Sequence, residues 1–309
     1  MSNGELAIDV HGLTKRFGTK VAVNRADIQV PVGEVWGFLG PNGSGKTTTI
    51  RMLCGLLRAD EGSGTVLGFD FRAQPEQIKR EVGYMTQRFS FWEDLSIREN
   101  LEFVARVYGL PNVKEVVTAQ IERLGLIKRQ DQLAGDLSGG WKQRLALAAC
   151  MLHQPKMLLL DEPTAGVDPK ARRDFWDEIH RLSDEGLTVL VSTHYMDEAE
   201  RCDRIVYINL GDIVARGTVA GVIEQSGLHT FVVQGEGARA LAPQLHGKPG
   251  VDFVAFFGAA LHVSGRDPAK LKAALEPFAQ QKGLTIQESK PSLEDVFIQL
   301  QEKGRGAYA

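Results

Sequence analysis

Apolar and polar residues alternate with a period of two over the first 39 residues. Apolar pairs at 8 and 10, 21 and 23, and 28 and 30 predict three short strands, broken near Gly12 and Gly18 and at 31–33. Because such alternation buries only one face of a sheet, we expect the chain to open with an antiparallel β-rich subdomain.

Longer apolar runs come later. Residues 157–160 are all apolar and 187–191 nearly so, which is typical of strands buried on both faces in the centre of a parallel sheet. A strand at 204–209 and another at 213–216 are separated by a Gly211 turn and predict a hairpin.

Helical periodicity dominates the middle of the chain. A helix is predicted over 48–53, followed by a turn at 60–64, a strand around 65–67 and a strand ending at 84–87. From 88 to about 135 the pattern changes to helices with polar faces, at 97–108 and 113–124, so we expect a helical insert.

From about residue 228 the pattern restarts. It predicts strands and helices in the order β-α-β-β-α-β, typical of a small ferredoxin-like module, and Ser292 with Asp295 then begins a last helix. The predicted elements are strands at 231–233, 251–257, 261–264 and 284–287, and helices at 238–245 and 269–280. We therefore predict an α/β fold with a first domain at 1–227 and a small α+β domain at 228–309.

Composition adds few constraints. The 309 residues have a formal net charge of −3, so no nucleic-acid partner is indicated by the charge. The longest apolar run, 145–152, is well short of the about 18–20 residues that span a bilayer, and the N-terminus lacks the pattern of a secretory signal. Three widely spaced cysteines fit a reducing cytoplasm and are best interpreted as small buried residues.

A glycine-rich loop at 40–47 lies between a predicted strand and a predicted helix. Glycines allow the backbone N–H groups to point inward, and the start of the helix adds a positive dipole end, so the loop is suited to phosphate. Lys46 would contact the terminal phosphates and the Thr47 hydroxyl would ligate Mg²⁺. The alternative is a purely structural glycine turn.

Polar residues follow the two buried strands. Asp161 and Glu162 stand at the carboxyl end of one, where open α/β sheets bind ligands, and His194 follows the other. We interpret Asp161 as a residue that holds Mg²⁺, Glu162 as the group that polarises the attacking water, and His194 as a γ-phosphate contact. The alternative for His194 is a structural role.

Three further features permit two interpretations each. Ser138, Gly139 and Gly140 are either an ordinary helix start or a second phosphate site. Phe17 is either a base-stacking ring or a core residue. The aromatic and acidic stretch 89–95 either packs the core of the insert or forms a socket for a partner.

Together these motifs resemble the ATP-binding-cassette (ABC) ATPases, the nucleotide-binding subunits of ABC transporters. They stand in family order: 40–47 for the Walker A loop, Gln87 for the Q-loop, 137–143 for the signature, 158–162 for Walker B with its catalytic acid, 165–168 for the D-loop and His194 for the switch. The resemblance implies ATP and Mg²⁺ as cofactors.

The resemblance also implies that two copies stack head to tail around shared ATP. Lys46, Glu162 and His194 would be catalytic, and Thr47, Gln87 and Asp161 would serve the metal. Residues implied to bind the nucleotide of their own copy are Phe17, Gly40, Pro41, Asn42, Gly43, Ser44, Gly45, Lys46, Thr47 and Thr48. Residues implied to contact the nucleotide of the partner copy are Ser138, Gly139, Gly140 and Asp168.

The C-terminal part, with a Pro-Ser-Leu-Glu-Asp-Val-Phe segment at 291–297, is similar to the drug-exporter branch of this family. That likeness implies a dimer on the cytoplasmic face of the membrane, working with a separate permease. One departure is Trp141, where the signature commonly has Gln. An ABC ATPase that acts on ribosomes or nucleic acid is the alternative; a small-molecule kinase or binding module would leave 137–140 and Glu162 unexplained.

Overall fold

Two units of the chain, Met1–Val214 and Ala215–Ala309, each carry their own sheets and helices. The structure is a computed structural model that describes residues 5–281 and 283–306, so residues 1–4, where no secretory signal is predicted, lie outside it. The division between the units falls within a strand, and the boundary predicted after residue 227 stays a prediction. Among the described residues, no helix is both long and apolar enough to span a bilayer.

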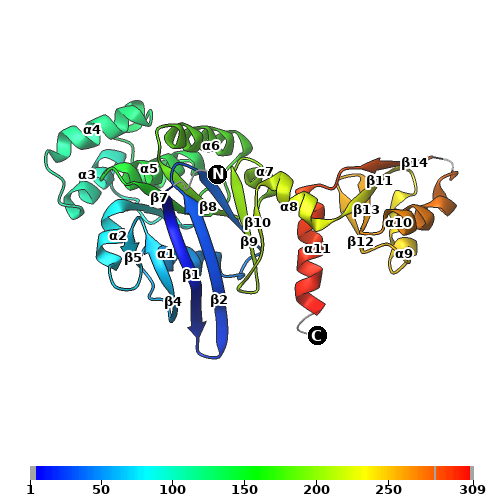
Figure 1. Cartoon of the computed structure of the whole chain (residues 1–309). Helices are drawn as coiled ribbons and strands as arrows, with labels where there is room; N and C mark the ends of the chain where they lie inside the picture. The colour runs from blue at the N-terminus through cyan, green and yellow to red at the C-terminus, as the bar shows by residue number, and fades with distance from the viewer. Residues whose placement is uncertain (1–4, 282, 307–309) are drawn as a thin grey trace. The chain divides into compact units, whose positions relative to one another are not determined.

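The first sheet is antiparallel, with strand order β2-β1-β4-β5 (Figure 1). Its strands are β1 (Leu6–Phe17), β2 (Lys20–Pro31), β4 (Glu61–Val66) and β5 (Phe69–Asp70). The antiparallel character is as expected, but the prediction of three short strands is wrong. The register shifts between Val10 and Leu13, where Gly12 has φ +62°, so one long strand passes through Gly12 as a bulge instead of ending there.

The predicted turn at 60–64 is also wrong, because β4 already begins at Glu61. Its glycine-rich stretch pairs with β1, and Gly64 stands opposite Val10. Local composition indicates a turn, but a distant strand supplies the hydrogen-bond partners and keeps the segment extended.

The second sheet has strand order β10-β9-β3-β8-β7-β6 and is parallel from β9 to β6. Its strands are β3 (Val35–Leu39), β6 (Val82–Met85), β7 (Met157–Asp161), β8 (Thr188–Thr193), β9 (Arg204–Asn209) and β10 (Asp212–Gly217). Every residue of β7 and β8 is buried, which confirms the prediction of central strands, and β3 is buried throughout as well. Leu210 and Gly211 form the turn of the predicted hairpin, both with positive φ.

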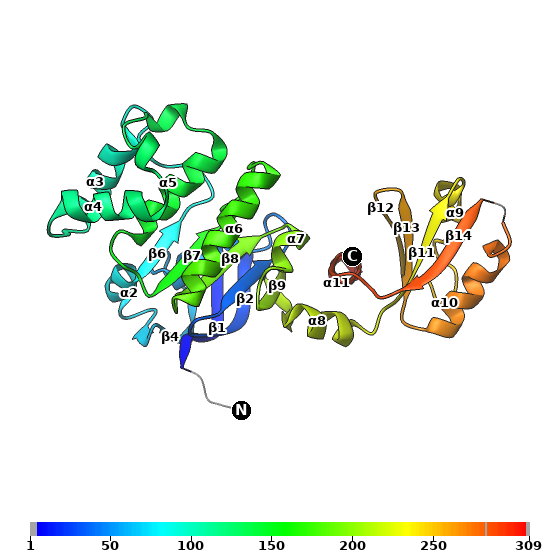
Figure 2. The ribbon, with the colours of Figure 1, turned by 90° about the horizontal axis from the view of Figure 1, so that it is seen from above.

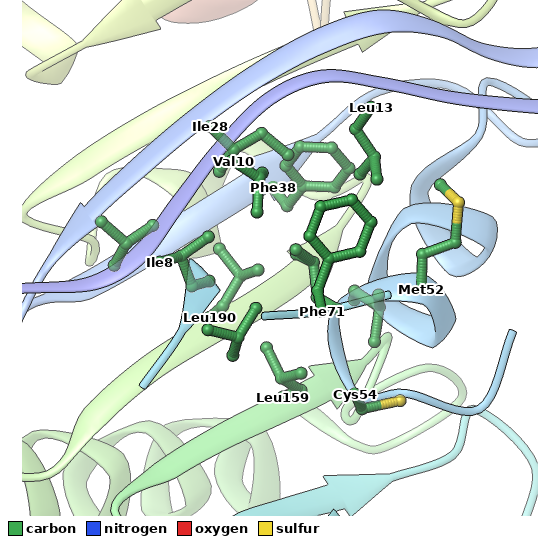
Figure 3. Packing of buried hydrophobic residues seen from close by; sticks show 14 of the residues in the cluster. Ile8, Val10, Leu13, Ile28, Phe38, Met52, Cys54, Phe71, Leu159 and Leu190 are labelled. Carbon is green, nitrogen blue, oxygen red and sulfur yellow. The ribbon is translucent and has the colours of Figure 1, made fainter. Parts of the chain in front are cut away.

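The two sheets of the first unit share one hydrophobic core. Figure 3 shows side chains of the antiparallel sheet, such as Ile8 and Leu13, packed toward Phe38 of β3 and Leu190 of β8, with Met52 of the first helix beside them. This packing fixes β3 and that helix, the two elements that flank the loop between them.

Helices cover the parallel sheet and form the insert. Those of the first unit are α1 (Lys46–Leu53), α2 (Pro75–Glu81), α3 (Ile97–Val107), α4 (Val113–Arg123), α5 (Gly139–Met151), α6 (Pro169–Asp184) and α7 (Met196–Ala199). Figure 2 shows α3 and α4 gathered beside α5, away from the antiparallel sheet. A capping box between Ser96 and Glu99 begins α3. The predicted helical insert is therefore present.

The second unit contains a four-stranded antiparallel sheet of order β12-β13-β11-β14. Its elements are α8 (Val219–Ser226), β11 (His229–Gly235), α9 (Ala238–Leu245), β12 (Phe253–Phe257), β13 (Ala260–Gly265), α10 (Pro268–Leu275), β14 (Leu284–Ser289) and α11 (Leu293–Gly306). This strand order confirms the predicted ferredoxin-like arrangement. The helix predicted to reach residue 280 is shorter, because Pro277 lacks an N–H and the chain continues as a 3₁₀ turn, Glu276–Phe278.

Helices α5 and α6 pack closely at their first turns. A Cβ added to Gly140 would lie 2.5 Å from the Cβ of Ala171, whereas one added to Gly139 would meet nothing closer than 3.8 Å. The two adjacent glycines therefore have different environments: a side chain at position 140 would clash with Ala171, whereas one at position 139 would make only ordinary van der Waals contacts.

Replacing Gly140 with Ala is expected to destabilise the first unit by about 1–3 kcal/mol through overpacking against Ala171. Adding Ala171→Gly should remove the clash, so the double variant should be more stable than the sum of the single effects predicts. Urea unfolding of the four proteins in the cycle measures this coupling. Additive effects within about 0.5 kcal/mol would contradict the packing argument.

All three cysteines are buried, as predicted. Burial raises the pKa of Cys54 and of Cys150 to about 12 and raises the pKa of Cys202 as well. Because the thiolate is the reactive form, iodoacetamide at pH 8 should modify none of them in the native protein and all three in guanidinium. Mass spectrometry of both samples checks this, and native labelling at the rate of a free thiol would contradict it.

Candidate functional site

The glycine-rich loop connects the carboxyl end of β3 to the first residue of α1, as predicted. Gly45 has φ +113°, and a Cβ there would lie 2.4 Å from the carbonyl oxygen of Ala22. Only glycine fits this position, because both the backbone conformation and the approach to β2 exclude a side chain. The loop therefore presents its backbone at the positive end of α1.

Lys46 is almost completely buried at this loop. Its Nζ donates to the carbonyl oxygens of Gly40 at 2.8 Å and of Pro41 at 3.1 Å. It also lies 3.2 Å from Glu162 Oε1. The ammonium group is thus fixed inside the loop and directed toward the carboxyl end of β7.

Asp161 ends β7 beside the loop. Its Oδ1 accepts hydrogen bonds from the hydroxyl of Thr47 at 3.0 Å and from the hydroxyl of Ser192 at 2.7 Å. The structure therefore brings together the two residues predicted to hold Mg²⁺, which come from positions 114 residues apart.

Glu162 is the centre of the site. Its backbone is left-handed, with φ +46°, and its N–H donates to Ser192 Oγ at 2.9 Å. Its carboxylate lies 3.2 Å from Lys46 Nζ and, through Oε2, accepts from Gln87 Nε2 at 2.9 Å and lies 3.2 Å from His194 Nδ1. Left-handed backbone is costly for a non-glycine residue and is often found at functional sites.

Four of the predicted residues therefore lie together, with Lys46, Gln87 and His194 meeting at the carboxylate of Glu162. They follow β3, β6, β7 and β8, whose parallel alignment brings their carboxyl ends to the same edge of the sheet. Gln87 contacts Glu162 here, and not Thr47 or Asp161, the other two residues assigned to the metal by resemblance. A carboxylate placed beside a phosphate loop can orient and polarise a water molecule.

A cavity of about 460 Å³ opens between this cluster and the end of the β1–β2 hairpin. Phe17 stands at its rim with 52% of its surface exposed, so the interpretation of Phe17 as a core residue is wrong. The lining residues are Phe17, Lys20, Ala22, Asn42, Gly43, Gly45, Lys46, Thr47, Thr48, Gln87 and Glu162. An aromatic ring at one end and a phosphate loop at the other suit a nucleotide.

The second glycine-rich turn does not line this cavity. Ser138 and Gly139 are exposed at the start of α5, and the Ser138 side chain makes no capping hydrogen bond, although Ser138 occupies the N-cap position. Asp168 caps α6 nearby, its Oδ1 accepting from the N–H groups of Lys170 and Ala171. Since α5 and α6 pack at their first turns, the residues assigned to a partner's nucleotide form a second, separate edge.

Two guanidinium groups lie close to the ring of Trp141. The Cζ atoms of Arg129 and Arg144 are 4.7 Å and 5.3 Å from its ring centroid. Arg144 also donates to the carbonyl of Leu124 and faces Asp174 of α6 at 3.8 Å. Trp141 therefore connects the start of α5 to the helical insert through cation–π contacts.

Ser192 is a site residue that the sequence analysis missed. It is fully buried and contacts both carboxylate residues, Asp161 through its side chain and Glu162 through the backbone N–H. No motif points to Ser192, because its position directly opposite Asp161 is set by the pairing of β8 with β7.

Comparisons with known proteins agree with this geometry. The family described as ABC transporter matches residues 23–165. The probable multidrug ABC transporter ATP-binding protein YbhF of Escherichia coli (strain K12) is 43% identical over 225 residues, which are 72% of this chain but only 39% of that protein. The Nod factor export ATP-binding protein I of Rhizobium sp. (strain N33) is 37% identical over 300 residues, 96% of this chain and 97% of that protein.

A solved structure extends the similarity to the fold. The ADP conformation of MJ1267, an ATP-binding cassette of an ABC transporter, matches with a TM-score of 0.63 and 27% identity, covering 69% of this chain and 91% of that one. With the motifs in family order and a full-length relative above one-third identity, the chain belongs to the ABC transporter family, as one of its ATP-binding-cassette ATPases.

Proposed function

We propose that this chain binds ATP with Mg²⁺ and that its ATP hydrolysis drives export through a separate membrane permease. The observation that carries the proposal is the convergence of Lys46, Gln87 and His194 on Glu162, at the mouth of a cavity that begins at a phosphate loop. Hydrolysis of a terminal phosphate uses groups of these kinds to bind the phosphate and to orient the attacking water.

The donor set fits Mg²⁺. This ion prefers oxygen ligands, keeps several waters and is commonly held by one or two protein groups together with phosphates. Thr47 Oγ1 and Asp161 Oδ1 lie 3.0 Å apart at the loop and would hold it. When bound, Mg²⁺ would neutralise charge on the β- and γ-phosphates.

Each of the remaining site residues has its own role in the proposed reaction. The loop N–H groups and Lys46 bind the triphosphate, and Phe17 stacks on the adenine at the other end of the cavity. Glu162 orients and polarises the water, and His194, 3.2 Å from Glu162, contacts the γ-phosphate. Gln87 donates to Glu162 and lies at the start of the helical insert, so it connects the site to the permease side.

Two copies of the chain would complete the site. Ser138 and Gly139 are exposed, and the Ser138 hydroxyl is not used to cap α5, so the first turn of α5 can approach a phosphate bound elsewhere. Because this turn does not line its own cavity, the partner copy's ATP is the natural ligand. Asp168, at the adjacent start of α6, faces the same interface.

The helical insert is the proposed contact with the permease. Exposed apolar side chains are grouped there, which is uncommon on the surface of a soluble monomer. The rings of Trp92 and Phe103 pack edge to face with their centroids 4.3 Å apart, and Val107 is 69% exposed. Phe89 and Phe91 are half-buried and pack on each other, so the choice between a core and a socket for 89–95 stays open. Docking of this surface would place the chain on the cytoplasmic face of the membrane.

The proposal of export rests on the relatives. The two described above are named for multidrug transport and for Nod factor export, not for action on ribosomes or nucleic acid. The alternative function therefore has no support from them.

Replacing Glu162 with Gln should leave ATP binding near the wild-type level, because the amide keeps the shape of the side chain. Turnover should fall by about 10²–10⁴-fold, because the amide cannot accept a proton from water. The variant should also persist as an ATP-bound dimer. Phosphate release, equilibrium nucleotide binding and size-exclusion chromatography measure the three quantities.

The matched control is Glu122→Gln on the exposed surface of α4, which should hydrolyse ATP at the wild-type rate. Turnover by Glu162→Gln within a fewfold of this control would remove Glu162 from its proposed role.

Sharing of sites between copies predicts a complementation pattern in mixed dimers. A dimer with Ser138→Arg in one chain and Lys46→Ala in the other should keep one intact site and about half of the activity. Both substitutions in the same chain of a mixed dimer should break both sites. Differently tagged chains allow each dimer to be purified and its ATP hydrolysis measured.

Ser289→Arg, at an exposed serine of β14, is the control for a bulky charged side chain and should behave as wild type. The opposite pattern, with activity lost when the substitutions are in different chains and kept when they share one, would show that Ser138 serves its own chain's nucleotide.

A further inference from the structure

Glu198 is a buried carboxylate outside the residues described so far. It lies on α7, directly after β8, and only 1% of its surface is exposed. A buried carboxylate is costly unless hydrogen bonds and an opposite charge compensate it, so its partners indicate what it does.

Each oxygen of Glu198 accepts a hydrogen bond from a different catalytic segment. Thr164 Oγ1, two residues after Glu162, donates to Oε1. Thr193 Oγ1, in the residue immediately before His194, donates to Oε2 at 2.5 Å. Both threonines are themselves 1% exposed, so no water competes for these bonds.

The charge of Glu198 is compensated by α6. Arg172 Nε lies 3.5 Å from Oε1, and the same guanidinium group stacks on the ring of Tyr195 at 4.2 Å. The Tyr195 N–H donates to Thr193 Oγ1 at 3.0 Å, which fixes the hydroxyl so that its proton points to Glu198. The carboxylate is therefore held in one place from three elements of the fold.

We propose that Glu198 is a positioning residue for ATP hydrolysis, which holds Glu162 and His194 at the spacing that catalysis needs. It touches neither side chain and acts by fixing the two segments on either side of their 3.2 Å contact. Glu162 has left-handed backbone, so its segment depends on the surrounding structure to keep that conformation. The inference rests on the proposed function, because it assigns Glu198 to that same reaction.

The contacts of Glu198 also link the site to the first turns of α6. Thr164 lies in the segment that leads to Asp168 at the start of α6, and Arg172 lies one turn further along that helix.

The test compares Glu198→Gln with Glu200→Gln, an exposed neighbour on the same turn. Glu198→Gln should lower kcat by about 10–100-fold, the usual cost of losing an outer-shell partner, and change ATP affinity by less than about threefold. Glu200→Gln should leave both at wild-type values. An unchanged kcat in Glu198→Gln would overturn the proposal.

A second measurement separates positioning from simple stability. In a His194→Ala background, Glu198→Gln should lower kcat by less than about twofold further, because residues that act as a unit are not additive. An undiminished loss in that background would overturn the claim that Glu198 acts through this pair.

If Glu198→Gln does not fold, two variants of Thr193 test the proposal instead. Thr193→Ser keeps the hydroxyl and should retain kcat within about twofold, whereas the isosteric Thr193→Val removes it and should lose about tenfold or more. Equal activity of the two would overturn the proposal. A wild-type protein that hydrolyses no ATP would instead defeat the proposed function, so the two failures are distinguishable.

Discussion

A single buried carboxylate sets the architecture of the first unit. Glu162 must stay at the end of a fully buried strand, where desolvation of its charge is costly unless polar partners compensate it. Those partners are an ammonium, an amide and an imidazole from the ends of three other strands. The parallel sheet brings these partners together because its strands end at one edge. The sheet order therefore determines where the phosphate loop and the other site residues lie.

In one copy of the chain, the phosphate loop and the start of α5 lie on separate edges. The carboxylate cluster and the phosphate loop occupy one edge, whereas the first turns of α5 and α6 form another edge with an exposed serine hydroxyl. Packing of Gly140 on Ala171 fixes that second edge, and contacts of Trp141 with two arginines connect it to the helical insert. The two edges lie apart in one chain, which is why we propose that two chains share each triphosphate.

Much of this could be predicted from the sequence, because the decisive features are local. A glycine loop between strand and helix, and acidic residues after an apolar strand, indicate a phosphate site without knowledge of neighbours. The lengths of β1 and β4 could not be predicted, because their hydrogen-bond partners are distant in sequence. Ser192 and Glu198 belong to no motif, and their roles arise from buried contacts that only the tertiary structure creates. The left-handed backbone of Glu162 is likewise set by its surroundings.

The most direct test is an experimental structure of the Glu162→Gln variant loaded with ATP and Mg²⁺. It should show each γ-phosphate between Lys46 of one copy and the Ser138 hydroxyl of the other, with Thr47 and Asp161 at the metal. A nucleotide-loaded structure in which Ser138 lies far from every triphosphate would contradict the shared site.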